Sequence, residues 1–319
     1  MGDVDGRNGP VAAFGSVNGV DVFLAGDALA AGRVTRHEIA AHHRRVLPRV
    51  WTPNGGATDL NDRIVAAWLW SERRGVVCGV AASALHGAAW VNADVPIELD
   101  MHRDKSPAGV IVRREKLLEN EVTDFGGITA TTVPRTAFDL ARYGPRGTAL
   151  QRLDALARAT DFTTEQVETV LDVHPGIRGR RRVPGLLQFV DRGAQSPKET
   201  WLRVVLIEGG FPRPQTQIPV PAPDGYPRYF LDMGWPEFMV AVEYDGQQHR
   251  TDDAQYRNDV LRSEYIASLG WQRIRVLAGH RREDIVARVA HTGVPRDFID
   301  CAIWQAVTRT KPAGPRFRR

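Results

Sequence analysis

The sequence contains almost no cysteine. Its two cysteines, Cys78 and Cys301, stand far apart in the chain. This scarcity excludes a disulfide framework, and it also excludes the paired cysteines of structural zinc sites. We therefore expect two unrelated thiols in a protein of a reducing compartment.

Long apolar runs are also missing. No stretch of the sequence approaches the ~18 apolar residues that a membrane-spanning helix needs. The first twenty residues do not join a basic segment to an apolar one, as a secretory signal does. The expectation is a cytoplasmic protein that has no membrane partner.

Lysine is rare, and arginine supplies most of the positive charge. The four lysines are Lys105, Lys116, Lys198 and Lys311. The net charge is only +4, but basic residues cluster at 178–182 and again at 309–319. Such clusters suit a phosphate backbone, although a solvated linker and a disordered tail would have the same composition.

The length of the chain suggests two domains or three small ones. With 319 residues, of which 43% are hydrophobic, each domain can bury a core. The fold class expected overall is α/β. The predicted parts are a disordered N-terminus at 1–20, a winged helix-turn-helix at 21–55, an α+β region at 56–192, a mixed-sheet domain at 196–290, and a C-terminal helix with a basic tail at 291–319.

The N-terminal part has the pattern of two helices and a β-ribbon. A helix over 21–31 is followed by a capping box of Thr35 and Glu38, which begins a second helix over 36–45. An extended segment is expected at 48–53. In a helix-turn-helix the second helix enters the major groove. The side chains expected to meet DNA there are Arg36, His37, His42, His43, Arg44 and Arg45. A helix pair with a solvated basic face is the alternative.

The middle of the chain alternates between helical and extended patterns. Helices are predicted at 59–74, 80–86, 132–142, 146–159, 163–173 and 184–191, and strands at 97–101 and 110–113. A domain boundary is expected near 192–196, where glycine and proline interrupt the pattern.

The C-terminal pattern predicts a mixed sheet flanked by helices. A helix begins at Ser196, strands follow at 215–220, 226–233 and 238–245, and a helix at 252–269 leads to a strand at 272–277. The first three strands have short connections and must be antiparallel. The long helix is a crossover, so the last strand can lie parallel to strand 238–245.

Two carboxylates end the apolar strand 238–245. Strand alternation places Glu243 and Asp245 on one face, with Val242 and Tyr244 on the other. Because no lysine is near to pair with them, they would repel each other, and a divalent cation such as Mg²⁺ or Mn²⁺ would remove that cost. Asp232 is the natural third ligand if the hairpin is centred near 237–238, with Pro236 inside a loop.

Several short motifs extend this pattern along residues 196–290. They are Glu199, Leu231-Asp232, Val242-Glu243-Tyr244-Asp245-Gly246, His249, Arg257-x-Asp259-x-x-Arg262, Leu269-Gly270-Trp271 and Arg273-Ile274-Arg275-Val276. Together they resemble the nuclease-like group related to the very-short-patch-repair (Vsr) endonucleases, within the PD-(D/E)xK superfamily. The resemblance implies a restriction-endonuclease-like core, acidic residues that bind Mg²⁺, and cleavage of DNA phosphodiester bonds.

A weaker resemblance covers the chain upstream, at about 20–190. Through the helix-turn-helix pattern and Thr132-Val133-Pro134-Arg135-Thr136-Ala137-x-Asp139, this part is similar to bacterial AbiEi-type antitoxins and regulators. That resemblance implies DNA as a partner, and a toxin-antitoxin or defence system as the setting. A homodimer is compatible with it.

The nuclease resemblance departs from its family at one position. The superfamily usually has lysine two residues after the strand glutamate, and here that residue is Asp245. His249 is then the candidate general base, and Arg257 or Arg262 would supply positive charge and contact DNA. Glu199 is either a helper of the metal site or only the acid of a capping box with Ser196.

Two functions are therefore predicted. The first is a Mg²⁺-dependent DNA endonuclease, with Asp232, Glu243 and Asp245 as metal ligands and with Glu199 and His249 assisting catalysis. The alternative is a DNA-binding transcriptional regulator, or an antitoxin-like protein, whose nuclease fold is inactive. Cleavage of RNA in place of DNA is also compatible with the sequence.

Overall fold

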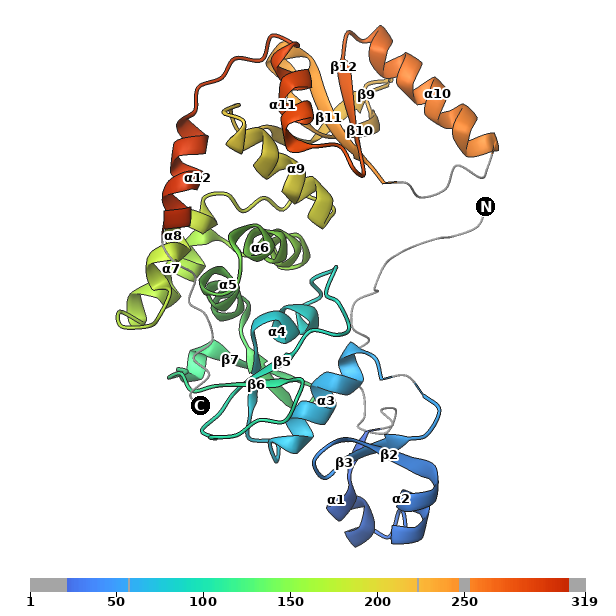
Figure 1. Cartoon of the computed structure of the whole chain (residues 1–319), viewed down its shortest axis with the longest axis vertical. Helices are drawn as coiled ribbons and strands as arrows, with labels where there is room; N and C mark the ends of the chain where they lie inside the picture. The colour runs from blue at the N-terminus through green and yellow to red at the C-terminus, as the bar shows by residue number, and fades with distance from the viewer. Residues whose placement is uncertain (1–21, 57, 223, 247–252, 310–319) are drawn as a thin grey trace. The chain divides into compact units, whose positions relative to one another are not determined.

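The protein consists of two compact units that interleave along the chain. The computed structural model describes residues 22–56, 58–222, 224–246 and 253–309 (Figure 1). Unit 1 comprises Met1–Leu140 and Ala159–Ile177, and unit 2 comprises Ala141–Arg158 and Arg178–Arg319. Among the described helices, none combines the length and the apolar character needed to cross a bilayer.

Unit 1 opens with two short helices and a small antiparallel sheet. The helices are α1 (Ala25–Ala30) and α2 (Arg36–His42), and the strands β1 (Phe23–Leu24), β2 (His43–Leu47) and β3 (Val50–Pro53) lie in the order β1-β3-β2. The predicted capping box is present. The Glu38 N–H donates to Thr35 Oγ1 at 3.1 Å, and the Thr35 N–H donates to Glu38 Oε2 at 2.7 Å.

The predicted helix over 36–45 is wrong at its C-terminal end. The chain becomes extended at His43, so Arg44 and Arg45 lie on strand β2 and not on the recognition-type helix. The physical reason is the pair Val46 and Leu47, which pack against the core of unit 1 from this strand. The backbone N–H and C=O groups of β2 form ladder hydrogen bonds with β3, so they do not need an additional helical turn to be paired.

Helix α3 (Leu60–Trp70) connects this region to the rest of unit 1. Asp59 caps it, because its side chain accepts the Asp62 N–H at 2.7 Å. The helix ends before the predicted residue 74, since Glu72 and Arg73 both take a left-handed φ of 61°. Its buried side chains share one apolar core with the β2–β3 hairpin and with the sheet that follows.

That sheet has five strands in the order β6-β5-β4-β8-β7. They are β4 (Val76–Cys78), β5 (Ile97–Asp100), β6 (Val110–Arg113), β7 (Val122–Phe125) and β8 (Ile128–Thr131). Strands β5 and β6 were predicted, and β4, β7 and β8 were missed. A strand of three or four residues contains too few alternations to stand out in a sequence.

The remaining helices up to residue 187 follow the predicted ranges closely. They are α4 (Gly79–Leu85), α5 (Val133–Arg142), α6 (Arg146–Thr160), α7 (Thr164–Val173) and the shorter α8 (Val183–Leu187), with 3₁₀ turns at Glu119–Glu121 and Arg180–Arg182. The chain passes from unit 1 to unit 2 at the end of α5 and returns at the end of α6.

Unit 2 contains the predicted mixed sheet, in the order β12-β11-β10-β9. Its strands are β9 (Gln215–Pro221), β10 (Pro227–Trp235), β11 (Val240–Asp245) and β12 (Gln272–Leu277), and its helices are α9 (Pro197–Glu208), α10 (Asp253–Ser268), α11 (Arg282–Ala290) and α12 (Ile299–Arg309). Strand β12 pairs parallel with β11, and the other two pairings are antiparallel. The crossover prediction is confirmed.

Helices cover both faces of this sheet (Figure 1). Val242 and Tyr244 of β11 belong to the core formed with α9 and α11, whereas Ala241 packs in a second core with Ile266 of α10. The alternation predicted for β11 is therefore confirmed. Glu243 shares the face of Ala241, which is the face that α10 covers.

Candidate functional site

Strands β10 and β11 bring two of the predicted metal ligands together. Met233 pairs with Val242, so the next residues outward, Asp232 and Glu243, stand across from each other. The connection is a 3₁₀ turn over Pro236–Phe238. This is the loop that the sequence required if the two carboxylates were to meet.

The third predicted ligand, Asp245, lines the same small pocket. Its volume is about 160 Å³, and its lining residues are Asp232, Glu243, Tyr244, Asp245, Asp259, Arg262, Ser263, Arg273 and Arg275. Carboxylates and guanidinium groups thus line one concave surface together.

Glu243 is buried and is neutralised by two arginines. Arg262 Nη2 on α10 donates to Glu243 Oε1 at 2.8 Å, and Arg273 Nε on β12 lies 2.6 Å from Glu243 Oε2. Both oxygens of the carboxylate are therefore occupied. Arg262 also donates to the Phe230 carbonyl at 2.9 Å, so this predicted DNA contact faces its own protein.

Asp245 is paired in the same way, with Arg275 of β12. The premise that Glu243 and Asp245 lack a basic partner is therefore wrong. Lysine is absent, but the parallel neighbour strand places Arg273 and Arg275 beside the two carboxylates. The charges of Glu243 and Asp245 are therefore compensated by arginine side chains, without a metal cation.

Asp232, unlike Glu243 and Asp245, has no described ion pair with an arginine. Its Oδ2 accepts the Tyr244 N–H at 2.9 Å. Burial, together with the nearby charges of Glu199 and Glu243, raises the pKa of Asp232 to about 7 against the opposing effect of that hydrogen bond. This group therefore changes its protonation near neutral pH.

Glu199 has the capping role that the sequence offered as an alternative. Ser196 Oγ donates to Glu199 Oε1 at 2.9 Å, and the Gln195 N–H donates to Glu199 Oε2 at 2.8 Å. Burial raises the pKa of Glu199. Its charge still acts on Asp232, so the cap also contributes to the electrostatics of the pocket.

The remaining predicted residues of this site are not placed. His249 lies outside the described residues, and Arg257 lies on α10 with its side chain outside the described part. Among the described residues, no group of three or more His, Cys, Asp or Glu side chains could hold a metal ion. Divalent metal binding by Asp232, Glu243 and Asp245 stays a prediction.

Arg273 and Arg275 line the pocket, and the sequence motif that contains them was given no role at this site. A signal was present, because Arg273-Ile274-Arg275-Val276 alternates charge with apolar residues on a strand expected beside 238–245. Strand alternation places the two arginines on one face, beside the two carboxylates of the parallel neighbour strand. This arrangement would have been enough to predict the two ion pairs.

A second candidate site is the basic surface at the start of unit 1. Arg36 and His37 are exposed on α2, and Arg45 and Arg49 are exposed on the β2–β3 hairpin. Arg49 pairs with Glu72 at 2.8 Å across two half-exposed side chains. Arg44 is half-buried, and its Nη2 donates to the Gly56 carbonyl at 2.8 Å.

The basic cluster at 178–182 is only partly available to a partner. Arg182 is buried, and its Nη1 donates to the Gly144 carbonyl at 2.7 Å. The C-terminal cluster falls largely outside the described residues. The first cluster therefore contributes to packing within unit 2.

A buried charge network lies in the region that resembles antitoxins. Arg135 is only 1% exposed, and it contacts Glu121 at 2.8 Å, Glu115 at 2.9 Å and Asp139 at 3.2 Å. His174 Nε2 is 2.7 Å from Glu121 Oε1. Arg135 and Asp139 are two of the motif residues that carried the resemblance, and this network shows that they have a structural role.

Comparison with known proteins agrees with the weaker of the two resemblances. Residues 75–189 match the family model of the AbiEi antitoxin C-terminal domain. The relatives include Uncharacterized protein MT2308 of Mycobacterium tuberculosis strain CDC 1551 / Oshkosh and Uncharacterized protein Rv2248 of strain H37Rv. Each is 28% identical over 250 residues, which cover 76% of this chain and 91% of the relative. No solved structure matches the chain. Residues 75–189 are therefore similar to the C-terminal domain of an antitoxin.

Proposed function

We propose that this protein is a DNA-binding regulator of the AbiEi antitoxin kind. The observation that carries the proposal is the match of residues 75–189 to the antitoxin domain. Along the chain, this region follows a helix pair, a hairpin with exposed arginines and helix α3. A toxin would be the protein partner in such a system. A homodimer would supply the two-fold symmetry with which helix-turn-helix proteins read paired half-sites.

The DNA-binding module in this proposal is a winged helix-turn-helix. Helix α2 would enter the major groove with Arg36 and His37, which are exposed on its surface. The β2–β3 hairpin would be the wing, with Arg44, Arg45 and Arg49 toward the phosphates. Phosphate contacts position such a protein, and base contacts from α2 would give it specificity.

Measuring DNA affinity against salt concentration tests this function. We expect the full chain to bind a labelled duplex from upstream of its own gene in fluorescence anisotropy, with an affinity that falls as salt rises. The double substitution R36A/R45A should weaken binding about tenfold or more. It should also reduce the salt slope by about one for each DNA phosphate that the protein no longer neutralises.

The matched control is Arg114→Ala, which removes a half-exposed arginine elsewhere in unit 1, paired with Asp104. It should leave DNA affinity almost unchanged. The proposal fails if the wild-type protein does not bind DNA, or if the control weakens binding as much as R36A/R45A.

A metal-dependent nuclease in unit 2 is the second candidate function. It is favoured by the pocket that Asp232, Glu243 and Asp245 share, and by the like charges that, after burial, raise the pKa of Asp232. Mg²⁺ or Mn²⁺ would relieve that crowding. Arginines, however, already occupy Glu243 and Asp245, so the described arrangement does not fit a divalent cation, and we derive no reaction step through one.

Nicking of supercoiled plasmid in the presence of Mn²⁺ separates the two functions. The regulator predicts DNA binding without cleavage, and it predicts that E243Q binds DNA as the wild type does. Cleavage by the wild type that E243Q abolishes would establish the nuclease and would leave the predicted roles of Glu199, His249, Arg257 and Arg262 to be tested one at a time.

A further inference from the structure

A second pocket lies within unit 1, where the β2–β3 hairpin, α3 and the strands β5 and β6 meet. Its volume is about 240 Å³. Its apolar lining comes from Val46, Leu47, Ala66, Ile97 and Val110. All of these side chains belong to, or pack against, the core of unit 1. The apolar wall is therefore part of the folded unit and not of an isolated loop.

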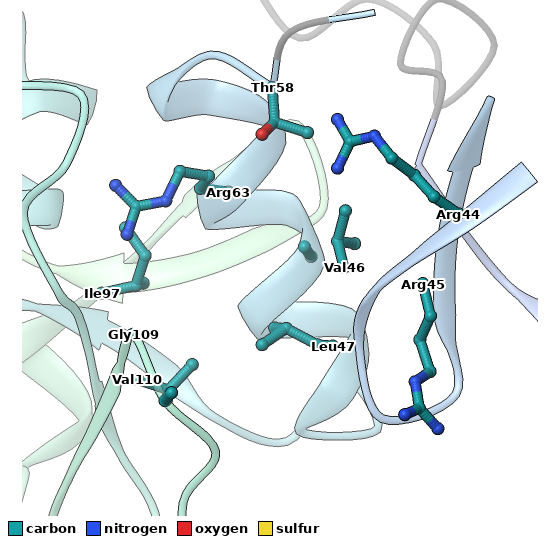
Figure 2. A pocket seen from close by; sticks show the side chains of 11 residues that line it. Arg44, Arg45, Val46, Leu47, Thr58, Arg63, Ile97, Gly109 and Val110 are labelled. Atoms are coloured by element: carbon teal, nitrogen blue, oxygen red, sulfur yellow. The ribbon is translucent and has the colours of Figure 1, made fainter. Parts of the chain in front are cut away.

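The charged residues that line this pocket are all basic. Arg44, Arg45, Thr58 and Arg63 line it, and the described lining residues include no carboxylate. Figure 2 shows Arg44 reaching from β2 toward Thr58, while Arg45 extends away from them and Arg63 projects from α3. Arg44 and Arg63 thus bring positive charge to the lining from two different elements, β2 and α3.

Neither of these two arginines is neutralised by the described residues. The Arg44 guanidinium donates to the Gly56 carbonyl at 2.8 Å, and the Arg63 guanidinium donates to the Ala93 carbonyl. Both partners are neutral backbone groups, so each guanidinium keeps its charge and further donors. The contrast with Arg262, Arg273 and Arg275 of unit 2, all paired with carboxylates, is clear.

From this combination we infer that the pocket binds a small organic anion, a carboxylate on a compact apolar body. Inorganic phosphate would satisfy the arginines but leave the apolar wall uncovered. A neutral apolar molecule would bury the wall but leave the cations unpaired, which is costly. The volume equals about eight water molecules at ~30 Å³ each, which suits a single ring or a short branched chain and not a nucleotide.

Occupancy of the pocket would regulate DNA binding, a consequence that rests on the proposed function. Arg44 lies on the strand that would form the wing, and Val46 and Leu47 of the same strand form part of the pocket wall. A carboxylate held by Arg44 competes with DNA phosphate for the same guanidinium. The ligand is therefore expected to weaken DNA binding.

Ligand-observed NMR on the full chain tests the site directly. The probes are benzoate, phenylacetate and 3-methylbutanoate, each compared with its neutral amide. We expect saturable binding of at least one carboxylate, and we expect its amide to bind at least about tenfold more weakly. Inorganic phosphate at equal concentration should not displace the carboxylate.

Two variants link that binding to the pocket. Arg63→Met keeps the apolar stem and removes the charge, so it should weaken carboxylate binding about tenfold, whereas Arg114→Met should not. Ala108 is exposed and lines the pocket, so Ala108→Leu can cover the opening without disturbing the core, and it should also abolish binding.

The outcomes separate the site from the proposed function. If none of the three carboxylates binds, if amides bind as well, if phosphate displaces the ligand, or if R63M and A108L change nothing, the inference is overturned. Carboxylate binding that leaves DNA affinity unchanged overturns only the regulatory coupling. Failure of the protein to bind DNA at all counts against the proposed function and leaves the site standing.

Discussion

At the residue scale, Glu243 shows why a count of acids does not predict a metal site. The two carboxylates of β11 were expected to repel each other for want of a lysine. Arg262, Arg273 and Arg275 compensate them. Buried charge needs a partner, and the partners here come from a neighbouring strand and helix, beyond the reach of local sequence reasoning.

Removal of Glu243 tests this charge balance by the sign of its effect. Glu243→Ala leaves two arginines, one of them largely buried, without their carboxylate, and should lower the free energy of unfolding by about 3 kcal/mol. Asp245→Ala breaks a more exposed pair and should cost less than about 1 kcal/mol. Urea denaturation of both variants measures the difference. Stabilisation by Glu243→Ala would instead mean that the carboxylates repel each other.

Asp232 predicts a pH dependence of stability. Its pKa is about 7 in the folded protein and near 3.8 as a free side chain, so the folded state holds the proton more tightly. The resulting stabilisation is fully present below about pH 4 and is lost as pH rises through about 7. At about 1.4 kcal/mol per pH unit, it amounts to ~4 kcal/mol at most.

Asp232→Asn should remove this component. The stability of the wild type relative to the variant should fall as pH rises from about 4 to 7, measured by urea denaturation at several pH values. Burial also raises the pKa values of Asp100 and Asp154 to about 6. These two groups contribute equally to the pH dependence of both proteins, so their effects cancel in the comparison. Parallel curves for the two proteins would show that Asp232 titrates normally.

At the scale of elements, helix α2 depends on its capping box. Helices of this length are marginal in isolation, so Thr35→Ala should destabilise the α2 region by about 1 kcal/mol. Faster hydrogen exchange of the α2 amides, with little change at α3, would report this loss. Thr35→Ser keeps the hydroxyl and should exchange as the wild type does; equal exchange in the alanine variant would rule out a stabilising cap.

Elements were predictable where the local signal was long or repeated. The capped helix α3, the crossover helix α10 and strand β12 follow from periodicity and punctuation alone. The end of α2 did not, because residues 43–45 are compatible with both helix and strand. Packing of Val46 and Leu47 decided between the two, and propensity is weaker than such burial.

At the scale of the whole molecule, distant segments combine into units that the order of the chain does not show. In unit 2, Arg203 of α9 is fully buried and its Nη2 is 2.7 Å from Asp154 Oδ2 of α6. Thr200 donates to the same oxygen at 2.8 Å. These contacts join residues 141–158 to the mixed-sheet segment. Because Asp154 and Arg203 are far apart in the sequence, no local pattern predicts their pairing.

The sequence by itself determined the helical caps and the mixed parallel and antiparallel pairing of the second sheet, and it indicated the hairpin centre, near residues 237–238, that Asp232 needs in order to lie across from Glu243. These depend on residue spacing and on the lengths of connections, which are local quantities. Tertiary structure alone decided which charges meet. The parallel pairing of β11 with β12 brings Arg273 and Arg275 to the carboxylates, whereas no described carboxylate of unit 1 pairs with Arg44 or Arg63. Electrostatic partners are chosen by proximity in space, because charges interact across a few ångströms whatever their separation along the chain.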